Sequence, residues 1–176
     1  MFTGIVQLGK IEKISKSSKG HEIEVSSSFN IKSIKIGESI AIDGACLSVV
    51  AKNNKNLRFF ASPETLKKTI LSTYQKKSAV NIEMPMKSGE FLGGHYVLGH
   101  VDAVSSVKKI TKKDNVWILE IHLPQQFKQY VVYKGSISVN GVSLTINKVK
   151  KESFELCIIP ITLKKSNISS LKKGSL

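Results

Sequence analysis

The sequence predicts an all-β fold made of two similar antiparallel Greek-key barrels, each of six strands. Apolar residues alternate with polar ones in many short segments, which is typical of half-buried strands. Asp43-Gly44 and Asn140-Gly141 each separate two such segments, and these pairs are a strong signal for a β-hairpin. A block of sequence also occurs twice, so the two barrels are predicted to come from an internal duplication.

The duplication is visible in two blocks that keep their spacing. Ser39–Val49 matches Ser136–Ile146, and Pro63–Thr69 matches Pro160–Ser166, both at an offset of 97 residues. More weakly, Phe2–Val6 matches Leu98–Asp102 at an offset of 96 residues. We therefore expect one domain at residues 1–86 and a second at residues 87–176.

Strands are expected wherever the alternation is regular. In chain order these segments are Lys10–Ile14, Glu22–Ser26, Ile40–Ile42, Leu47–Val49, Leu57–Ala61 and Ala79–Glu83, then Val104–Ile110, Val116–His122, Ile137–Val139, Leu144–Ile146 and Phe154–Ile159. Glu64–Leu71 and Ile161–Ile168 each follow a proline and suit a short helical turn, because proline is tolerated at the first helical position. The second copy has no counterpart of Ala79–Glu83, so its last strand is expected to be missing.

The composition bounds the class of protein. Of 176 residues, 41% are hydrophobic and 23% charged, which is enough apolar material for a packed core. No apolar run approaches the roughly 20 residues of a membrane helix, and the N-terminus has no signal-peptide pattern. The two cysteines, Cys46 and Cys157, cannot form a disulfide scaffold, which favours a reducing cytoplasm.

The net charge of +14 suggests nucleic acid as a partner. However, Arg58 is the only arginine, the lysines are scattered along the whole chain, and only 7% of residues are aromatic. Arginine forks and aromatic stacking are what nucleic-acid sites depend on. We therefore interpret the charge as a lysine-rich solvated surface, with no nucleic acid and no membrane as partner.

Small polar residues recur at equivalent places in the two halves. The pairs are Ser39 and Ser136, Cys46 and Ser143, Ser48 and Thr145, and Thr65 and Thr162. Singly, each is more typical of a satisfied strand or cap residue than of a site. Their repetition implies that a pocket in one half has a similar pocket in the other, so that the protein can hold two similar ligands.

Two differences between the halves add candidates for chemistry. Residues 93–100, Gly-Gly-His-Tyr-Val-Leu-Gly-His, contain two histidines, whose spacing matches no usual zinc pattern, so no metal site is expected. His100 suits proton transfer because histidine titrates near neutral pH. Cys46, which is Ser143 in the other copy, is open to two interpretations: buried packing, or a nucleophile or polar contact.

Together the motifs resemble those of the riboflavin synthase family. The resemblance rests on Met1–Val6 (MFTGIV), Asp43–Ser48 (DGACLS), Pro63–Leu66 (PETL), Gly93–Asp102 (GGHYVLGHVD), Tyr133–Thr145 (YKGSISVNGVSLT) and Ile159-Pro160. It implies a dismutation in which two molecules of 6,7-dimethyl-8-ribityllumazine give riboflavin and 5-amino-6-ribitylaminouracil. No external cofactor is implied. The implied assembly is a homotrimer whose sites form between neighbouring subunits, and an association with lumazine synthase is left open.

The resemblance also implies which residues bind substrate. The first pocket would be lined by Gly4, Ile5, Val6, Ser39, Cys46, Leu47, Ser48, Phe60, Ala61, Ser62, Pro63, Glu64 and Thr65. The second would be lined by Gly99, His100, Val101, Lys134, Ser143, Leu144, Thr145, Ile158, Ile159, Pro160, Ile161, Thr162 and Leu163. Backbone groups and hydroxyls of this kind suit a ring with carbonyl and imide edges and a ribityl chain.

For catalysis, the candidates are His100, Cys46, Ser143 and Thr145. His100 would handle the acidic proton of the substrate's C7 methyl with a serine or threonine hydroxyl, and Cys46 would assist at the acceptor ring. With its last strand missing, the 176-residue form is expected to be weakly active or weakly trimeric. The alternative is a non-catalytic lumazine- or flavin-binding antenna protein of the same fold, but both sets of polar residues are present, which favours the enzyme.

Overall fold

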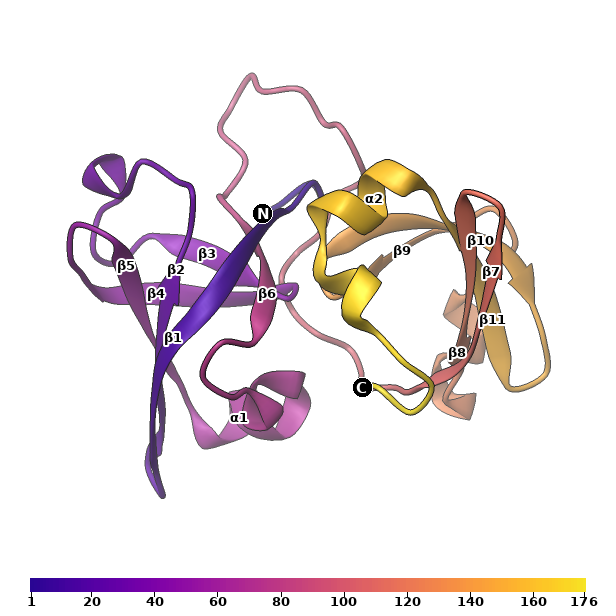
Figure 1. Cartoon of the computed structure of the whole chain (residues 1–176), viewed down its shortest axis with the longest axis horizontal. Helices are drawn as coiled ribbons and strands as arrows, with labels where there is room; N and C mark the ends of the chain where they lie inside the picture. Colours follow the sequence, from indigo (N-terminus) through magenta and orange to yellow (C-terminus); the bar gives the residue numbers. More distant parts are fainter.

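The computed structural model describes residues 1–176, which form two β-units side by side (Figure 1). The first is a closed barrel of β1 (Gln7–Ser17), β2 (Gly20–Ser26), β3 (Ser39–Ile42), β4 (Ala45–Lys52), β5 (Asn56–Ala61) and β6 (Ala79–Glu83). The second is a five-stranded sheet of β7 (Val107–Lys113), β8 (Val116–His122), β9 (Ser136–Val139), β10 (Val142–Val149) and β11 (Ser153–Ile158).

Both units have the same strand order, which confirms the predicted duplication. The barrel runs β1-β2-β5-β4-β3-β6, and the sheet runs β7-β8-β11-β10-β9. In each unit three hairpin-connected strands return beside an earlier strand, β5 beside β2 and β11 beside β8, which is a Greek-key arrangement. The second sheet has no counterpart of β6, as predicted.

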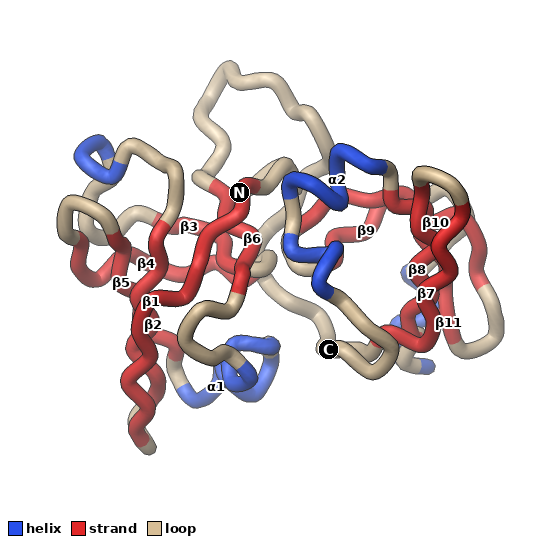
Figure 2. The backbone as a smooth tube through the Cα atoms, in the orientation of Figure 1, coloured by secondary structure: helices blue, strands red, loops and turns tan.

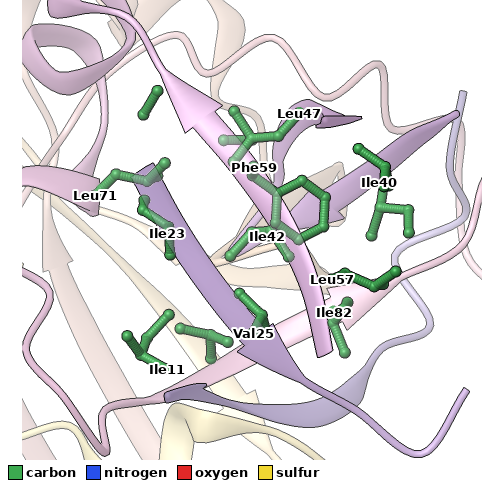
Figure 3. Close-up of a cluster of buried hydrophobic side chains, with 14 of the residues drawn as sticks. Ile11, Ile23, Val25, Ile40, Ile42, Leu47, Leu57, Phe59, Leu71 and Ile82 are labelled. Carbon is green, nitrogen blue, oxygen red and sulfur yellow. The ribbon is translucent and has the colours of Figure 1, made fainter. Parts of the chain in front are cut away.

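Each unit has its own hydrophobic core, to which strands such as β2, β4 and β5 contribute alternate residues. In the barrel, Ile23 and Val25 of β2 face Leu57 and Phe59 of β5, and all four are fully buried (Figure 3). Burying each such side chain contributes about 1.5–3 kcal/mol. The second core centres on Leu119, Ile146, Phe154, Leu156, Ile158 and Ile168.

A short helix follows the last hairpin strand of each unit, as predicted. These are α1 (Pro63–Lys68) and α2 (Pro160–Lys165), each continued by a 3-10 turn, at Ile70–Thr73 and Asn167–Ser170. Ser62 caps α1, because its hydroxyl accepts a 3.1 Å hydrogen bond from the Thr65 amide. Two further 3-10 turns lie at Ile31–Ser33 and Gln125–Tyr130, and no helix is long and apolar enough to span a bilayer.

The main difference from the predicted elements is the start of β7. The expected strand at Val104–Ile110 begins at Val107 instead, three residues later. In the first unit, residues 7–10 of β1 are in a strand because they pair with β6, and the residues before Val107 have no such partner. Residues 84–106 are therefore a long connection between the units (Figure 2), and this connection carries both histidines of the Gly93–Asp102 motif.

Candidate functional site

The site is organised by the two hairpin turns, which contact each other where the two units meet. Asp43-Gly44 and Asn140-Gly141 have positive φ at both residues, as a two-residue hairpin turn of this type requires. A Cβ added to Gly44 would lie only 2.8 Å from the amide nitrogen of Gly141. The two units therefore pack turn against turn. Cys46 of β4 and Ser143 of β10, each two residues after its turn, occupy equivalent positions on the two sides of this contact.

Two glycine segments then cross from one unit to the other. The Gly4 carbonyl accepts a 2.9 Å hydrogen bond from the Ser143 amide, and the Gly99 carbonyl accepts one of 2.8 Å from the Cys46 amide. Val6 packs against the core of the second unit, whereas Val101 packs against the core of the first. Each half of the site is therefore completed by a segment that the other half supplies.

Only glycine fits at the two crossing points. Gly4 has φ of 78° and Gly99 has φ of 82°, the left-handed region that side chains disfavour. A Cβ on Gly4 would lie 2.5 Å from the Cβ of Ser143, and a Cβ on Gly99 would lie 2.6 Å from the Cβ of Cys46. The backbone at Gly4 thus packs directly against β10, and the backbone at Gly99 packs directly against β4.

Two parts of the sequence interpretation are wrong here. The expected division put Gly4, Ile5 and Val6 with the first pocket and Gly99, His100 and Val101 with the second, whereas the crossing places each set on the other unit. The weak repeat at an offset of 96 is also out of step by one residue. Gly4 and Gly99, which have the same conformation and the same type of contact, correspond at an offset of 95.

The remaining predicted residues of the first half lie on one surface around β4. Ser39 of β3 pairs with Ser48 of β4, and Val49 pairs with Phe59 of β5. Continuing this register by one residue brings Phe60 beside Ser48. The start of α1, with Ser62, Pro63, Glu64 and Thr65, follows directly from β5, while Ala61 and Leu47 are buried beneath the surface.

The second half repeats this arrangement around β10. Ser136 pairs with Thr145, and Ile146 pairs with Leu156, so that Ile158 lies beside Leu144 when the register is continued. Ile159, Pro160 and Ile161 are exposed at the start of α2, and Thr162 and Leu163 are half-buried. Lys134 is exposed, and its amide donates a 2.8 Å hydrogen bond to the Ile146 carbonyl.

Cys46 and Ser143 differ in their surroundings although they are equivalent. Cys46 packs against a small buried cluster of Phe2, Ala41 and Val97, which matches its packing interpretation. The Ser143 hydroxyl lies 2.7 Å from Nδ1 of His95. Sequence reasoning considered His95 only as a metal ligand and missed this contact. No group of three or more metal-ligating side chains is present.

Burial lowers the pKa of His95, which favours the neutral ring at neutral pH. With the proton on Nε2, Nδ1 accepts the hydrogen of the Ser143 hydroxyl, which leaves the hydroxyl's lone pairs free for a ligand. His100, in contrast, is exposed beside Gly99. The two histidines of the motif thus lie at different halves of the site, His95 at Ser143 and His100 at Cys46.

Similarity to known proteins agrees with this arrangement. A family described as "Lumazine binding domain" matches residues 3–85 and again residues 98–176. The riboflavin synthase of Photobacterium phosphoreum is 39% identical over 99% of this chain and 81% of its own length. That of Bacillus subtilis (strain 168) is 34% identical over 99% of this chain and 82% of its own length.

The chain belongs to the riboflavin synthase family. The duplicated lumazine-binding fold of that family accounts for the two equivalent surfaces around β4 and β10. A solved structure of LumP complexed with riboflavin is also similar, with a TM-score of 0.92 and 25% identity over 99% of this chain and 96% of that one. The fold is therefore shared by enzymes named riboflavin synthase and by a protein crystallised with a bound flavin.

Proposed function

We propose that the chain is a riboflavin synthase, converting two molecules of 6,7-dimethyl-8-ribityllumazine into riboflavin and 5-amino-6-ribitylaminouracil. The observation that carries the proposal is the repeated surface: Cys46–Ser48 under Gly99, and Ser143–Thr145 under Gly4. A dismutation of two identical substrates needs two similar binding sites. Membership of the riboflavin synthase family supports the same reaction.

We assign substrate binding to the residues that line the two surfaces, with the segment at Gly4 counted in the second unit's site and the segment at Gly99 in the first unit's site. One site uses residues 46–48, 60–65 and 99–101 with Ser39, and the other uses residues 4–6, 134, 143–145 and 158–163. Exposed hydroxyls of Ser48 and Thr145 are available to the ribityl chain or the ring carbonyls. Apolar side chains beside them, such as Phe60 and Ile159, suit the ring faces.

We also propose that the working form is an assembly, and specifically the homotrimer of the family. Both surfaces are open within one chain: Ser48, Phe60 and Thr145 are exposed, and of the residues predicted to bind substrate only Gly99, His100 and Val101 border an 860 Å³ cavity. Ile5, Leu98 and Ile161 are each more than half exposed beside the two surfaces. A neighbouring copy would cover such side chains and bring one site against its counterpart.

Proton transfer and orientation then account for the reaction. A base removes a proton from the C7 methyl of one lumazine, and the resulting carbanion forms a carbon–carbon bond to the ring of the other. Cleavage of the carbon–nitrogen bonds that hold the four-carbon unit to one of the two molecules then releases that molecule as 5-amino-6-ribitylaminouracil. We assign the transfer of the C7 methyl proton to His100 or to the Ser143 hydroxyl, which lies 2.7 Å from Nδ1 of His95, with Thr145 beside Ser143. Holding two rings in register contributes at most ~7–11 kcal/mol to lowering the barrier. Cys46 would contact the acceptor ring from the other surface.

The second candidate is an antenna protein that binds lumazine or flavin without reaction. The similarity to LumP structures holding riboflavin and 6,7-dimethyl-8-ribityllumazine favours this candidate. Incubation with 6,7-dimethyl-8-ribityllumazine, followed by flavin absorbance and fluorescence, tests the two. Riboflavin accumulating beyond one equivalent per chain supports the enzyme, and saturable binding with no flavin formed supports the antenna protein.

A cytoplasmic location is a prediction from the cysteine content. An association with lumazine synthase is a further proposal, because that enzyme's product would be the substrate here. Co-sedimentation of the two purified proteins tests it, and separate migration at micromolar concentrations would contradict it.

A further inference from the structure

The crossing segment at the N-terminus is held by one buried carboxylate. Glu83, the last residue of β6, is 7% exposed. Its Oε1 accepts hydrogen bonds of 2.7 Å from both the amide and the hydroxyl of Thr3, and its Oε2 accepts one of 3.0 Å from the Gly4 amide. The carboxylate therefore satisfies three donors of two consecutive residues.

These contacts determine where the next residues lie. The Gly4 amide is bound to Glu83 in the first unit, while the Gly4 carbonyl is bound to Ser143 in the second. The peptide groups on either side of Gly4 are thus fixed to different units. Val6, two residues further on, packs against the core of the second unit.

The other crossing segment is held in a different way. Phe2 and Val97 exchange two main-chain hydrogen bonds, of 2.8 and 3.0 Å, and Gly99 accepts from Cys46. No carboxylate binds the amides of this segment. The two surfaces are therefore equivalent, but only one of the two crossing segments has its amides bound by a carboxylate.

We propose that Glu83 is a positioning residue for one of the two lumazine sites only, the site at Ser143–Thr145. Although it belongs to the first barrel, it fixes Thr3 and Gly4 so that residues 4–6 complete the site of the second unit. The site at Cys46–Ser48 does not depend on it. This inference rests on the proposed function, because it names a determinant of lumazine binding.

The test is a site-resolved titration by ¹⁵N-¹H NMR. The ligand is 6-methyl-7-oxo-8-ribityllumazine, which lacks the acidic C7 methyl and therefore binds without reacting. The amides of Cys46–Ser48 report one site, and those of Ser143–Thr145 report the other. In the unsubstituted protein both sets are expected to shift on titration.

Glu83→Ala is expected to weaken binding at Ser143–Thr145 by at least about tenfold and at Cys46–Ser48 by less than about twofold. Glu83→Gln is expected to lie between, because its oxygen still accepts from Thr3 while its amide group opposes the Gly4 amide. Gly99→Ala is the matched control. Its Cβ would meet Cys46, so it is expected to weaken the Cys46–Ser48 site and spare the other.

Equal losses at both sites, or no loss at either, would overturn the inference. Should Glu83→Ala fail to fold, Glu83→Gln, which keeps the shape of the side chain, gives the same comparison between sites. Absence of shifts at both sites in the unsubstituted protein would instead contradict the proposed function, so the two failures are distinguishable.

Discussion

The hydroxyl of Tyr74 donates a 2.6 Å hydrogen bond to Oδ2 of Asp43, and both side chains are buried. Oδ1 of Asp43 accepts from the Asn81 amide at 2.7 Å and from Nδ2 of Asn167 at 2.9 Å. Asn167 belongs to the second unit. The hairpin turn that begins the first ligand surface is therefore tied, through one carboxylate, to both units.

Asp43→Asn is expected to change how stability depends on pH. Burial raises the pKa of Asp43 to about 7, against the three hydrogen bonds that lower it. Because the unfolded value is about 3.9, the folded protein binds this proton more tightly, and the free energy of unfolding falls as pH rises between these values. The contribution is complete below pH ~4 and lost above pH ~7, at up to about 1.4 kcal/mol per pH unit.

Asparagine at position 43 cannot titrate, but its oxygen can still accept from Asn81 and Asn167. Urea unfolding at several pH values should therefore show Asp43→Asn gaining stability relative to the unsubstituted protein as pH rises toward 7. Parallel stability curves for the two proteins would contradict the assignment.

Asn167→Ala is expected to weaken the contact between the two units. Nδ2 of Asn167 donates to Asp43, and its Oδ1 accepts a 2.9 Å hydrogen bond from Asn81. Removing the side chain leaves buried polar atoms without partners, at a cost of about 1–3 kcal/mol. Chemical denaturation measures this cost. Ser169→Ala, on the exposed side of the same turn, should change stability by less than ~0.5 kcal/mol.

Cys46→Ser is expected to retain most of the turnover. The Cys46 side chain packs against Phe2, Ala41 and Val97, and the equivalent residue in the second unit is Ser143. A role in packing and polar contact predicts a loss of less than about tenfold, which is 1.4 kcal/mol. Steady-state kinetics with lumazine measure it. A complete loss of turnover in a folded Cys46→Ser protein would indicate that the thiol acts as a nucleophile.

His100→Gln is expected to slow turnover more than it weakens lumazine binding. His100 is exposed beside Gly99, where it can reach a proton on a bound ring but contributes little buried contact. Comparing kcat with the dissociation constant of the 7-oxo ligand separates these effects. His122→Gln, on β8, is the matched control. Equal losses in rate and affinity would show that His100 only shapes the site.

The fold could be predicted because its signals are local. Asp43-Gly44 and Asn140-Gly141 fix two hairpins, and the kept spacing of the repeat fixes their equivalence. Proline at positions 63 and 160 marks the start of each short helix. The start of β7 was misjudged because a strand also needs a partner, and local alternation at Val104 does not report one.

The crossing could not be predicted in the same way. Which unit Gly4 or Gly99 packs against depends on the path of a long connection, and neither residue differs locally from any other turn glycine. The buried contacts of Glu83 could not be predicted either, since an acidic residue at the end of a strand is usually solvated. His95 stood in a motif that sequence reasoning did single out, but its partner Ser143 lies 48 residues away.

The central claim is that two lumazine molecules, bound at two facing sites, react by transfer of a four-carbon unit from one to the other. An equal mixture of unlabelled lumazine and lumazine carrying ¹³C at C6, C7 and both methyl groups tests it by mass spectrometry of the riboflavin formed. The account predicts three flavin masses, of which the half-labelled one is about twice as abundant as either other. Riboflavin with only the two parental labelling patterns, or no riboflavin at all, would contradict it.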